Sequence, residues 1–254
     1  MTSVTQRIKV IKQPRGGYLS PNSFEKTRFE DGVELYPQDQ ETIKPHTIGI
    51  VVDYLTRFSQ GSLAKYAFSV SLEGARKVNE TEYAEELLSN ITGLDDNSII
   101  SACKLSGFDV ATRGLIAHYR PVQDINPSQE TIFNIRTMVE RSNKFFAING
   151  PIVKSNVQFP LGYTSTITTG DADFLTQTTL WDMKVSKLEK ITPDVTLQLL
   201  VYYLLGQNSM IEVLFDDVFY LGVFNPRLNI SYVTDVTTID PSIIDEVSKN
   251  VIGY

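Results

Sequence analysis

The chain has 254 residues, a net charge of −7 and 42% hydrophobic residues, which is ordinary for a globular protein with one large domain. No apolar run reaches the ~18 residues of a membrane helix, and residues 1–14 lack the hydrophobic segment of a secretory signal. We therefore expect a cytoplasmic protein without a membrane partner. The negative charge argues against strong non-specific binding of nucleic acid, whose phosphates attract Lys and Arg.

Cysteine and histidine are scarce in this sequence. Cys103 is the single cysteine, which excludes an internal disulfide and a zinc or iron–sulfur site built from several cysteines of the chain. His46 and His118 are the two histidines, too few for a histidine-rich metal site. A bound metal is therefore expected to be a hard cation with oxygen ligands.

Residues 1–45 are rich in proline and glycine and are expected to form an N-terminal arm with one short strand at 8–11. Residues 1–24 carry four basic side chains and no acid. This basic segment suits contact with a phosphate backbone, and it equally suits a solvated tail.

The next part of the chain has the periodicity of helices. Residues 48–58 repeat apolar side chains at helical spacing, and Gly61 is expected to end that helix. Residues 81–120 predict several short helices, the first capped by Thr81, and residues 129–147 predict a longer amphipathic one. We interpret residues 46–254 as a single domain that carries a helical insertion at about 81–147.

Beyond residue 150 the pattern changes to strands. Helices are expected at 192–205, closed by Gly206, and at 241–251. Strands are expected at 152–159, 163–169, 171–175, 179–185, 210–215, 218–223 and 229–236. Several links are too short for crossovers, so the predicted fold is α/β, with an antiparallel or mixed central sheet flanked by helices.

Two acids and a lysine form the first candidate site. A hairpin with its turn near Gln177 would bring Asp173 and Asp182 opposite each other on neighbouring strands. Lys184, two residues beyond Asp182, would share its face because side chains alternate along a strand. Two carboxylates can hold Mg²⁺ or Mn²⁺, and the lysine can contact an attacking water and a phosphate. The alternative is an Asp–Lys pair on the surface of an edge strand.

Gln198 and Tyr202 form a second pair of interest. They lie four residues apart on one face of the helix expected at 192–205, which is otherwise strongly apolar. Polar side chains on a buried helix need partners, and a site beside the sheet would supply them. A purely structural Gln–Tyr hydrogen bond is the alternative.

Together these groups resemble the PD-(D/E)XK nuclease superfamily, most closely its RecB-type, lambda-exonuclease-like branch. In that branch an early helix carries Gly-x-x-x-His/Glu, one strand carries Gly-x-x-Asp, the next carries Asp-x-Lys and the following helix carries Gln-x-x-x-Tyr. The matching residues here are Gly49 and Asp53, Gly170 and Asp173, Asp182 and Lys184, and Gln198 and Tyr202.

The resemblance implies a restriction-endonuclease-like core and Mg²⁺- or Mn²⁺-dependent hydrolysis of DNA phosphodiester bonds. Asp173 and Asp182 would be metal ligands, Lys184 would orient or activate water, and Gln198 and Tyr202 would position the substrate strand or support the site. Asp53 would complete the metal shell, although it is shorter than the Glu or His usual at that place. Glu140 is a rival for the same role.

Other interpretations remain open at this point. The chain could keep the nuclease fold with little or no catalysis and act as a nucleic-acid-binding or protein-binding module. The helical insertion could also recognise a protein partner. Exonuclease and endonuclease action, and DNA and RNA substrates, are equally compatible with the pattern.

Overall fold

A computed structural model describes residues 1–114 and 116–254, and its contacts divide the chain into two compact units. Unit 1 consists of Met1–Phe29 and Phe146–Tyr254, and unit 2 of Glu30–Phe145. The segment expected as an arm is thus shared between the units, and the helices expected at 81–147 fall in unit 2 as far as Phe145. Among the described helices, none is long and apolar enough to cross a membrane.

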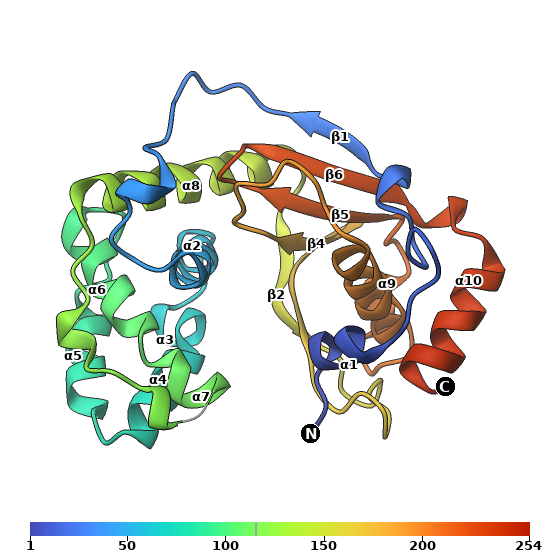
Figure 1. Cartoon of the computed structure of the whole chain (residues 1–254), viewed down its shortest axis with the longest axis horizontal. Coiled ribbons are helices and arrows are strands. Elements are labelled where there is room, and N and C mark those ends of the chain that lie inside the picture. The colour runs from blue at the N-terminus through green and yellow to red at the C-terminus, as the bar shows by residue number, and fades with distance from the viewer. Residues whose placement is uncertain (115) are drawn as a thin grey trace. The chain divides into compact units, whose positions relative to one another are not determined.

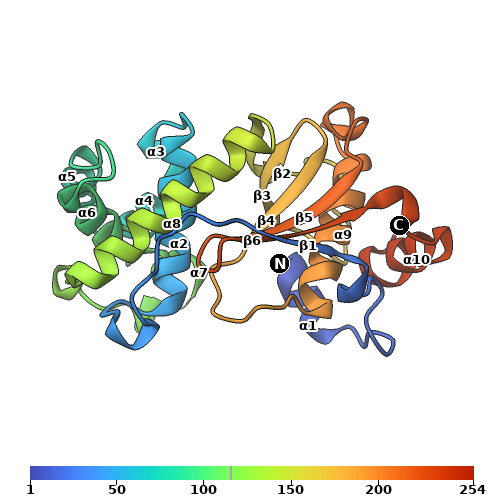
Figure 2. The ribbon, with the colours of Figure 1, turned by 90° about the horizontal axis from the view of Figure 1, so that it is seen from above.

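Unit 1 is built on a six-stranded sheet with the order β1-β6-β5-β4-β3-β2. β4 and β5 are parallel, and the other neighbouring pairs are antiparallel. Figure 2 shows the strands following one another in this order. The α/β class and the mixed sheet are therefore confirmed. The strands are β1 (Glu25–Arg28), β2 (Ile152–Gln158), β3 (Asp171–Thr176), β4 (Thr179–Met183), β5 (Tyr220–Asn225) and β6 (Ile230–Asp235).

Helix α9 (Pro193–Gln207) connects the parallel strands β4 and β5 and covers one face of the sheet (Figure 1). It begins with proline at its first turn, as predicted, although the side chain of Thr192 makes no capping hydrogen bond. The helix runs to Gln207, one residue beyond the end expected at Gly206. A Cβ at Gly206 would lie 2.3 Å from the ring of Phe215, so only glycine lets that ring pack.

The predicted strand at residues 8–11 is wrong, because residues 4–10 form helix α1 (Val4–Val10). Ser3 and Gln6 make a reciprocal capping box, which stabilises the first turn, and Val4 and Ile8 bury one face. Arg7, one of the four basic residues of the arm, donates to the carbonyls of Asn250 and Val251. These carbonyls belong to η7 (Val247–Ile252), which continues α10 (Pro241–Glu246).

Two further predicted strands of unit 1 are also wrong. Residues 163–169 form a loop, in which the hydroxyl of Thr164 accepts from the backbone N–H groups of Thr166 and Ile167. Such side-chain bonds compete with a strand ladder. Residues 212–215 form a short 3₁₀ helix, η5 (Glu212–Phe215), which turns Phe215 into the core.

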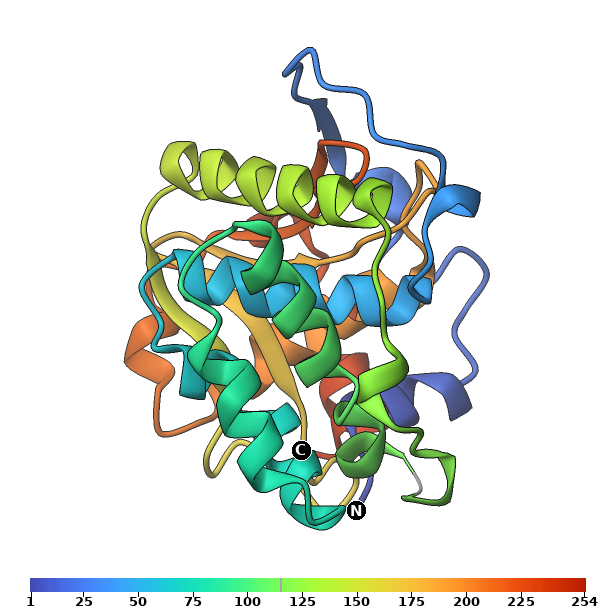
Figure 3. The ribbon, with the colours of Figure 1, turned by 90° about the vertical axis from the view of Figure 1, so that its left-hand side faces the viewer.

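Unit 2 is helical, and α2 (Pro45–Ser59) lies at its centre, between α8 and the shorter helices (Figures 1 and 3). The predicted helices at 48–58 and 129–147 are confirmed. Thr81 is not a cap, because Glu80 holds the N-cap position of its helix. The remaining helices are α3 (Ala64–Ala67), α4 (Ser69–Lys77), α5 (Thr81–Ser89), α6 (Asp96–Ser106), α7 (Asp109–Arg113) and α8 (Gln129–Ile148), whose last turn belongs to unit 1.

Candidate active site

The β3–β4 hairpin brings the two predicted aspartates together. Phe174 pairs with Trp181 and Leu175 with Leu180, and the same register places Asp173 opposite Asp182. Leu180 belongs to the core cluster that α9 shares, whereas Trp181 is buried against the position of Gly222 on the other face. Asp182 alternates with Trp181 and therefore lies on the α9 side of the sheet.

Asp182 is almost completely buried, with 1% of its surface exposed. Burial raises its pKa from the usual 3.8 to about 6, because an ionised carboxylate loses its hydration there. The positive charge of Lys184 opposes this rise, and the negative charge of Asp173 adds to it. The effect of Asp173 places the two carboxylates within electrostatic reach of each other.

Lys184 is the principal partner of Asp182. Its Nζ donates to Oδ1 of Asp182 at 2.9 Å and lies 2.8 Å from Oδ2. The second contact is a charge contact only, and Oδ2 receives no hydrogen bond from the residues that the structure describes. The lysine side chain is 37% exposed, so its ammonium group lies between the buried acid and solvent.

The backbone supports this arrangement from both neighbouring strands. Oδ2 of Asp173 accepts from the N–H of Met183 at 2.7 Å, which ties the first aspartate to the strand that carries the second. The N–H of Lys184 donates to the carbonyl of Phe224, so the parallel ladder extends one residue past β4. Lys184 is therefore held by β5 as well as by its own strand.

The helix pair joins the same network. Nζ of Lys184 donates to Oε1 of Gln198 at 3.4 Å, and Nε2 of Gln198 donates to the hydroxyl of Tyr202 at 2.9 Å. Burial, together with the carboxylates of Asp171, Asp182 and Asp173, raises the pKa of Tyr202. One chain of polar contacts therefore runs from β4 across to α9, and the predicted Gln–Tyr bond is part of it.

Two aromatic residues that the sequence analysis did not single out support Tyr202. The ring of Phe159 stacks on that of Tyr202, with centroids 5.7 Å apart and planes at 23°. The hydroxyl of Tyr163 accepts from the N–H of Phe159 and donates to the carbonyl of Gly170 at 2.5 Å. Gly170 is packed tightly, because a Cβ there would lie 2.7 Å from Val4. Phe159 and Tyr163 lay in segments that were expected to be strands, and nothing in the sequence pattern indicated that they support Tyr202.

The remaining predicted ligands lie in unit 2. Asp53, on α2, receives two hydrogen bonds from Arg57, at 2.9 and 2.7 Å, and this guanidinium group is itself buried. Its carboxylate is thus engaged in a bidentate ion pair one helical turn away. Glu140 lies on an exposed position of α8.

The donor set of unit 1 suits a hard cation in its chemistry. Both Asp173 and Asp182 offer carboxylate oxygens, and Oδ2 of Asp182 is buried without a hydrogen bond from the described residues. Within residues 1–114 and 116–254, however, no three His, Cys, Asp or Glu side chains converge as a metal site. Asp173 and Asp182 are the two carboxylates that the hairpin itself brings opposite each other.

Comparisons with protein-family models, with curated proteins and with solved structures returned no match for this chain.

Proposed function

We propose that the protein is a metal-dependent nuclease that hydrolyses DNA phosphodiester bonds on a restriction-endonuclease-like, PD-(D/E)XK core. The observation that carries this proposal is the hydrogen-bonded chain of Asp182, Lys184, Gln198 and Tyr202. An accidental Asp-x-Lys and an accidental Gln-x-x-x-Tyr would have no reason to meet. Here the two motifs meet beside a second aspartate, at the end of a buried strand.

Asp173 and Asp182 would hold Mg²⁺ or Mn²⁺ through their carboxylates. When bound, such an ion lowers the pKa of a water molecule and offsets the charge of the phosphate. Burial of Asp182 excludes water around its carboxylate, which strengthens every electrostatic interaction made there. The hydrogen bond from Met183 fixes the orientation of Asp173 before any ligand arrives.

Lys184 supplies the positive charge of the site. Its ammonium group is held by Asp182 and Gln198 yet remains partly exposed, so a phosphate oxygen can approach it from solvent. In that position it can orient a water molecule and stabilise the charge that develops on the phosphate. Tyr202 and Gln198 position this ammonium group.

A local basic surface follows Lys184 along the chain and suits a phosphate backbone despite the net charge of −7. The loop at 184–192 exposes Lys187 and Lys190. Glu189 of this loop forms ion pairs with both Lys26 and Arg28 of β1, so two cations share one acid. Exposed cations of this kind make the sequence-independent contacts that nucleic-acid binding requires.

The test is cleavage of linear duplex, circular duplex and single-stranded DNA by the purified protein, with Mn²⁺ and with a chelator. We expect Mn²⁺-dependent cleavage that Asp182→Ala and Lys184→Ala each abolish, while circular dichroism shows intact folds. Lys249→Ala, which removes an exposed lysine of the same unit, is the matched control and should cleave at the normal rate. Unchanged cleavage by Lys184→Ala would contradict the assignment.

A second candidate is a catalytically weak or inactive protein that uses the same fold to bind nucleic acid or protein. The observation in its favour is that Lys184 contacts both oxygens of Asp182, while no third acid joins the two aspartates among the described residues. Calorimetric titration with Mn²⁺ separates the candidates. A binding signal that Asp173→Ala removes supports the nuclease, and no signal in the wild type supports the inactive protein.

A further inference from the structure

The connection between α9 and β5 exposes several large apolar side chains. Met210 and Val213 are each 69% exposed, Phe219 is 43% exposed and Tyr220 40%. Residues 208–219 are therefore unlike an ordinary polar connection. Large apolar side chains that remain exposed in one short connection are candidates for contact with another molecule.

This connection is held in one conformation by its buried residues. Phe215 is 2% exposed, lies against Gly206, and packs near the rings of Phe159 and Tyr203. The N–H of Met210 donates to the carbonyl of Pro160 at 2.8 Å. The exposed side chains thus stand on a fixed base, which lowers the entropy cost of binding.

Leu161 is a further exposed apolar residue, next to Pro160, whose carbonyl accepts from Met210. Leu161 is 82% exposed and has a φ of +65°, a backbone conformation that favours glycine or asparagine. A leucine held there is strained, and it gains no burial from the described part of the chain. A binding partner that covers Leu161 would bury this side chain and so offset the cost of the strained backbone.

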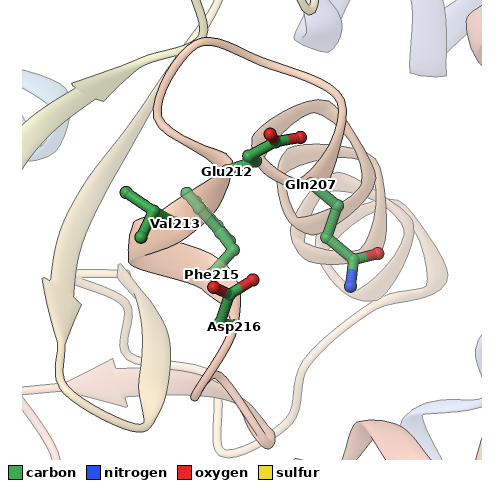
Figure 4. A pocket seen from close by; sticks show the side chains of 5 residues that line it. All are labelled: Gln207, Glu212, Val213, Phe215 and Asp216. Carbon is green, nitrogen blue, oxygen red and sulfur yellow. The ribbon is translucent and has the colours of Figure 1, made fainter.

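A pocket of about 350 Å³ lies within this connection, lined by Gln207, Glu212, Val213, Phe215 and Asp216. Figure 4 shows the two carboxylates and the amide around it, with Gln207 coming from α9 and the other side chains from η5 and the residue after it. Neither Glu212 nor Asp216 forms a salt bridge with any residue in the described part of the chain. Both carboxylates are exposed and keep their charge available.

We propose that this surface docks a basic, partly apolar segment of another protein, whose Arg or Lys side chain enters the pocket. The exposed side chain of Val213 suits the aliphatic stem of such a side chain, and Glu212 and Asp216 suit its charged end. Apolar neighbours of that residue would cover Met210 and Phe219. Nucleic acid does not fit, because Glu212, Asp216 and the adjacent Asp217 would repel phosphates.

The docking surface is separate from the candidate active site. Gln207 and Gln198 are nine residues apart on α9, which corresponds to about 14 Å along the helix axis. A bound segment would therefore recruit or locate the protein without occupying the site around Lys184. The inference does not depend on the proposed nuclease activity.

The experiment is selection of 12-residue peptides, displayed on phage, against the full-length protein. Selected peptides are synthesised, and their affinities are measured by fluorescence anisotropy. We expect them to carry Arg or Lys beside aromatic or aliphatic residues. Binding should weaken at least 10-fold for the double variant Glu212→Lys with Asp216→Lys, and similarly for Val213→Asp.

The matched control is Glu82→Lys with Glu86→Lys, which reverses two exposed acids four residues apart on α5 and should change affinity less than twofold. Peptides without a cation, equal affinity for the reversed variant, or no peptide tighter than 100 μM would overturn the proposal. So would a dimer of the wild type that Val213→Asp converts to monomer, because a second copy would then cover the surface. DNA cleavage by Val213→Asp is expected to match the wild type.

Discussion

Asp109 in unit 2 and Asp182 in unit 1 are both buried carboxylates, but their hydrogen-bond partners differ. Asp109 receives hydrogen bonds from Ser71 at 2.6 Å and from Tyr54 at 2.7 Å, one on each oxygen, and Arg113 lies 3.3 Å away. Asp182 receives one hydrogen bond, from Lys184, whose Nζ also lies 2.8 Å from the second oxygen, and that oxygen has no hydrogen bond from the described residues.

The difference distinguishes an acid that holds helices together from an acid whose principal partner is a partly exposed lysine. Tyr54, Ser71 and Asp109 come from α2, α4 and α7, so the satisfied carboxylate joins three helices of unit 2. Buried polar groups are normally satisfied, and an exception calls for a reason. At Asp182 the reason we propose is a bound cation.

Replacement of Asp182 by asparagine tests the proposed role of this carboxylate most directly. We expect Asp182→Asn to lower Mn²⁺-dependent cleavage on the order of 10³-fold, which is about 4 kcal/mol of transition-state stabilisation. Its free energy of unfolding without metal should be equal to or above that of the wild type, because a buried charge is removed. Cleavage rates and urea unfolding measure the two effects. A variant that is inactive because it is unfolded would contradict this.

The opposite result is expected at Asp109. Asp109→Ala leaves the hydroxyls of Tyr54 and Ser71 without their acceptor in a buried place, at a cost of about 3 kcal/mol of unfolding free energy. Urea unfolding at pH 7 measures this loss. Asp96→Ala is the control, because its carboxylate is half exposed and its pair with Arg136 should contribute less than about 1 kcal/mol. Equal losses in the two variants would remove the structural role.

Stability should also depend on pH through Asp182. Its pKa is about 6 in the folded protein and 3.8 ordinarily, so between these values the folded state binds more protons than the unfolded state. The metal-free protein should therefore lose about 1–3 kcal/mol of stability as the pH rises from 4 to 6. Burial raises the pKa of Asp109 too, and it acts in the same direction. Asp182→Asn should remove only the part of this pH dependence that comes from Asp182. If the unfolding free energy of the variant and of the wild type falls equally between pH 4 and 6, the prediction is wrong.

The smallest expected effect is at Tyr202. Tyr202→Phe takes away the acceptor of Nε2 of Gln198, which loosens the amide that holds Lys184, and cleavage should fall about 5- to 10-fold. Tyr203→Phe is a matched control on the same helix, because its hydroxyl accepts from Gln207 at 2.7 Å and lies outside the chain of contacts. If both variants cleave at the wild-type rate, Tyr202 has no positioning role.

The hairpin of the candidate site was predictable because it depends on local rules. The short turn between β3 and β4 sets the register, and strand alternation separates Asp182 from the buried Trp181. Helix α9 was predictable from Pro193 at its start and from its high content of leucine. These signals span fewer than about fifteen residues each, a range over which periodicity and turn chemistry dominate.

Two of the wrong strand predictions, at 8–11 and 163–169, fall where side chains form hydrogen bonds with nearby backbone groups. Residues 163–169 have the Thr and Ile content of a strand, yet Thr164 turns the chain by accepting from two N–H groups. At the N-terminus, the spacing of Ser3 and Gln6 was a visible capping box that outweighed the short apolar alternation. Neither outcome follows from hydrophobic periodicity.

Contacts between distant segments were beyond the reach of sequence patterns. The ion pair of Asp53 with Arg57 is an (i, i+4) helix pair and could have been anticipated. The network of Asp109, in contrast, joins Tyr54 and Ser71 across 55 and 38 residues. The stacking of Phe159 on Tyr202 is of the same kind. Contacts of this kind depend on how distant segments pack together, and the spacing of residues along the sequence does not predict them.

The pairing of β1 with β6 has a consequence for biosynthesis. β1 ends at Arg28 and its partner begins at Ile230, so about two hundred residues must be translated before that ladder can close. Lys184 likewise depends on Phe224 for its backbone bond. Ribosomes add roughly 5–20 residues per second, so the nascent chain spends on the order of ten seconds or more without the β1–β6 ladder, and roughly 2–8 s without the bond between Lys184 and Phe224. Until the second of these contacts forms, the backbone at Lys184 is not tied to β5, so the candidate site is incomplete on the nascent chain.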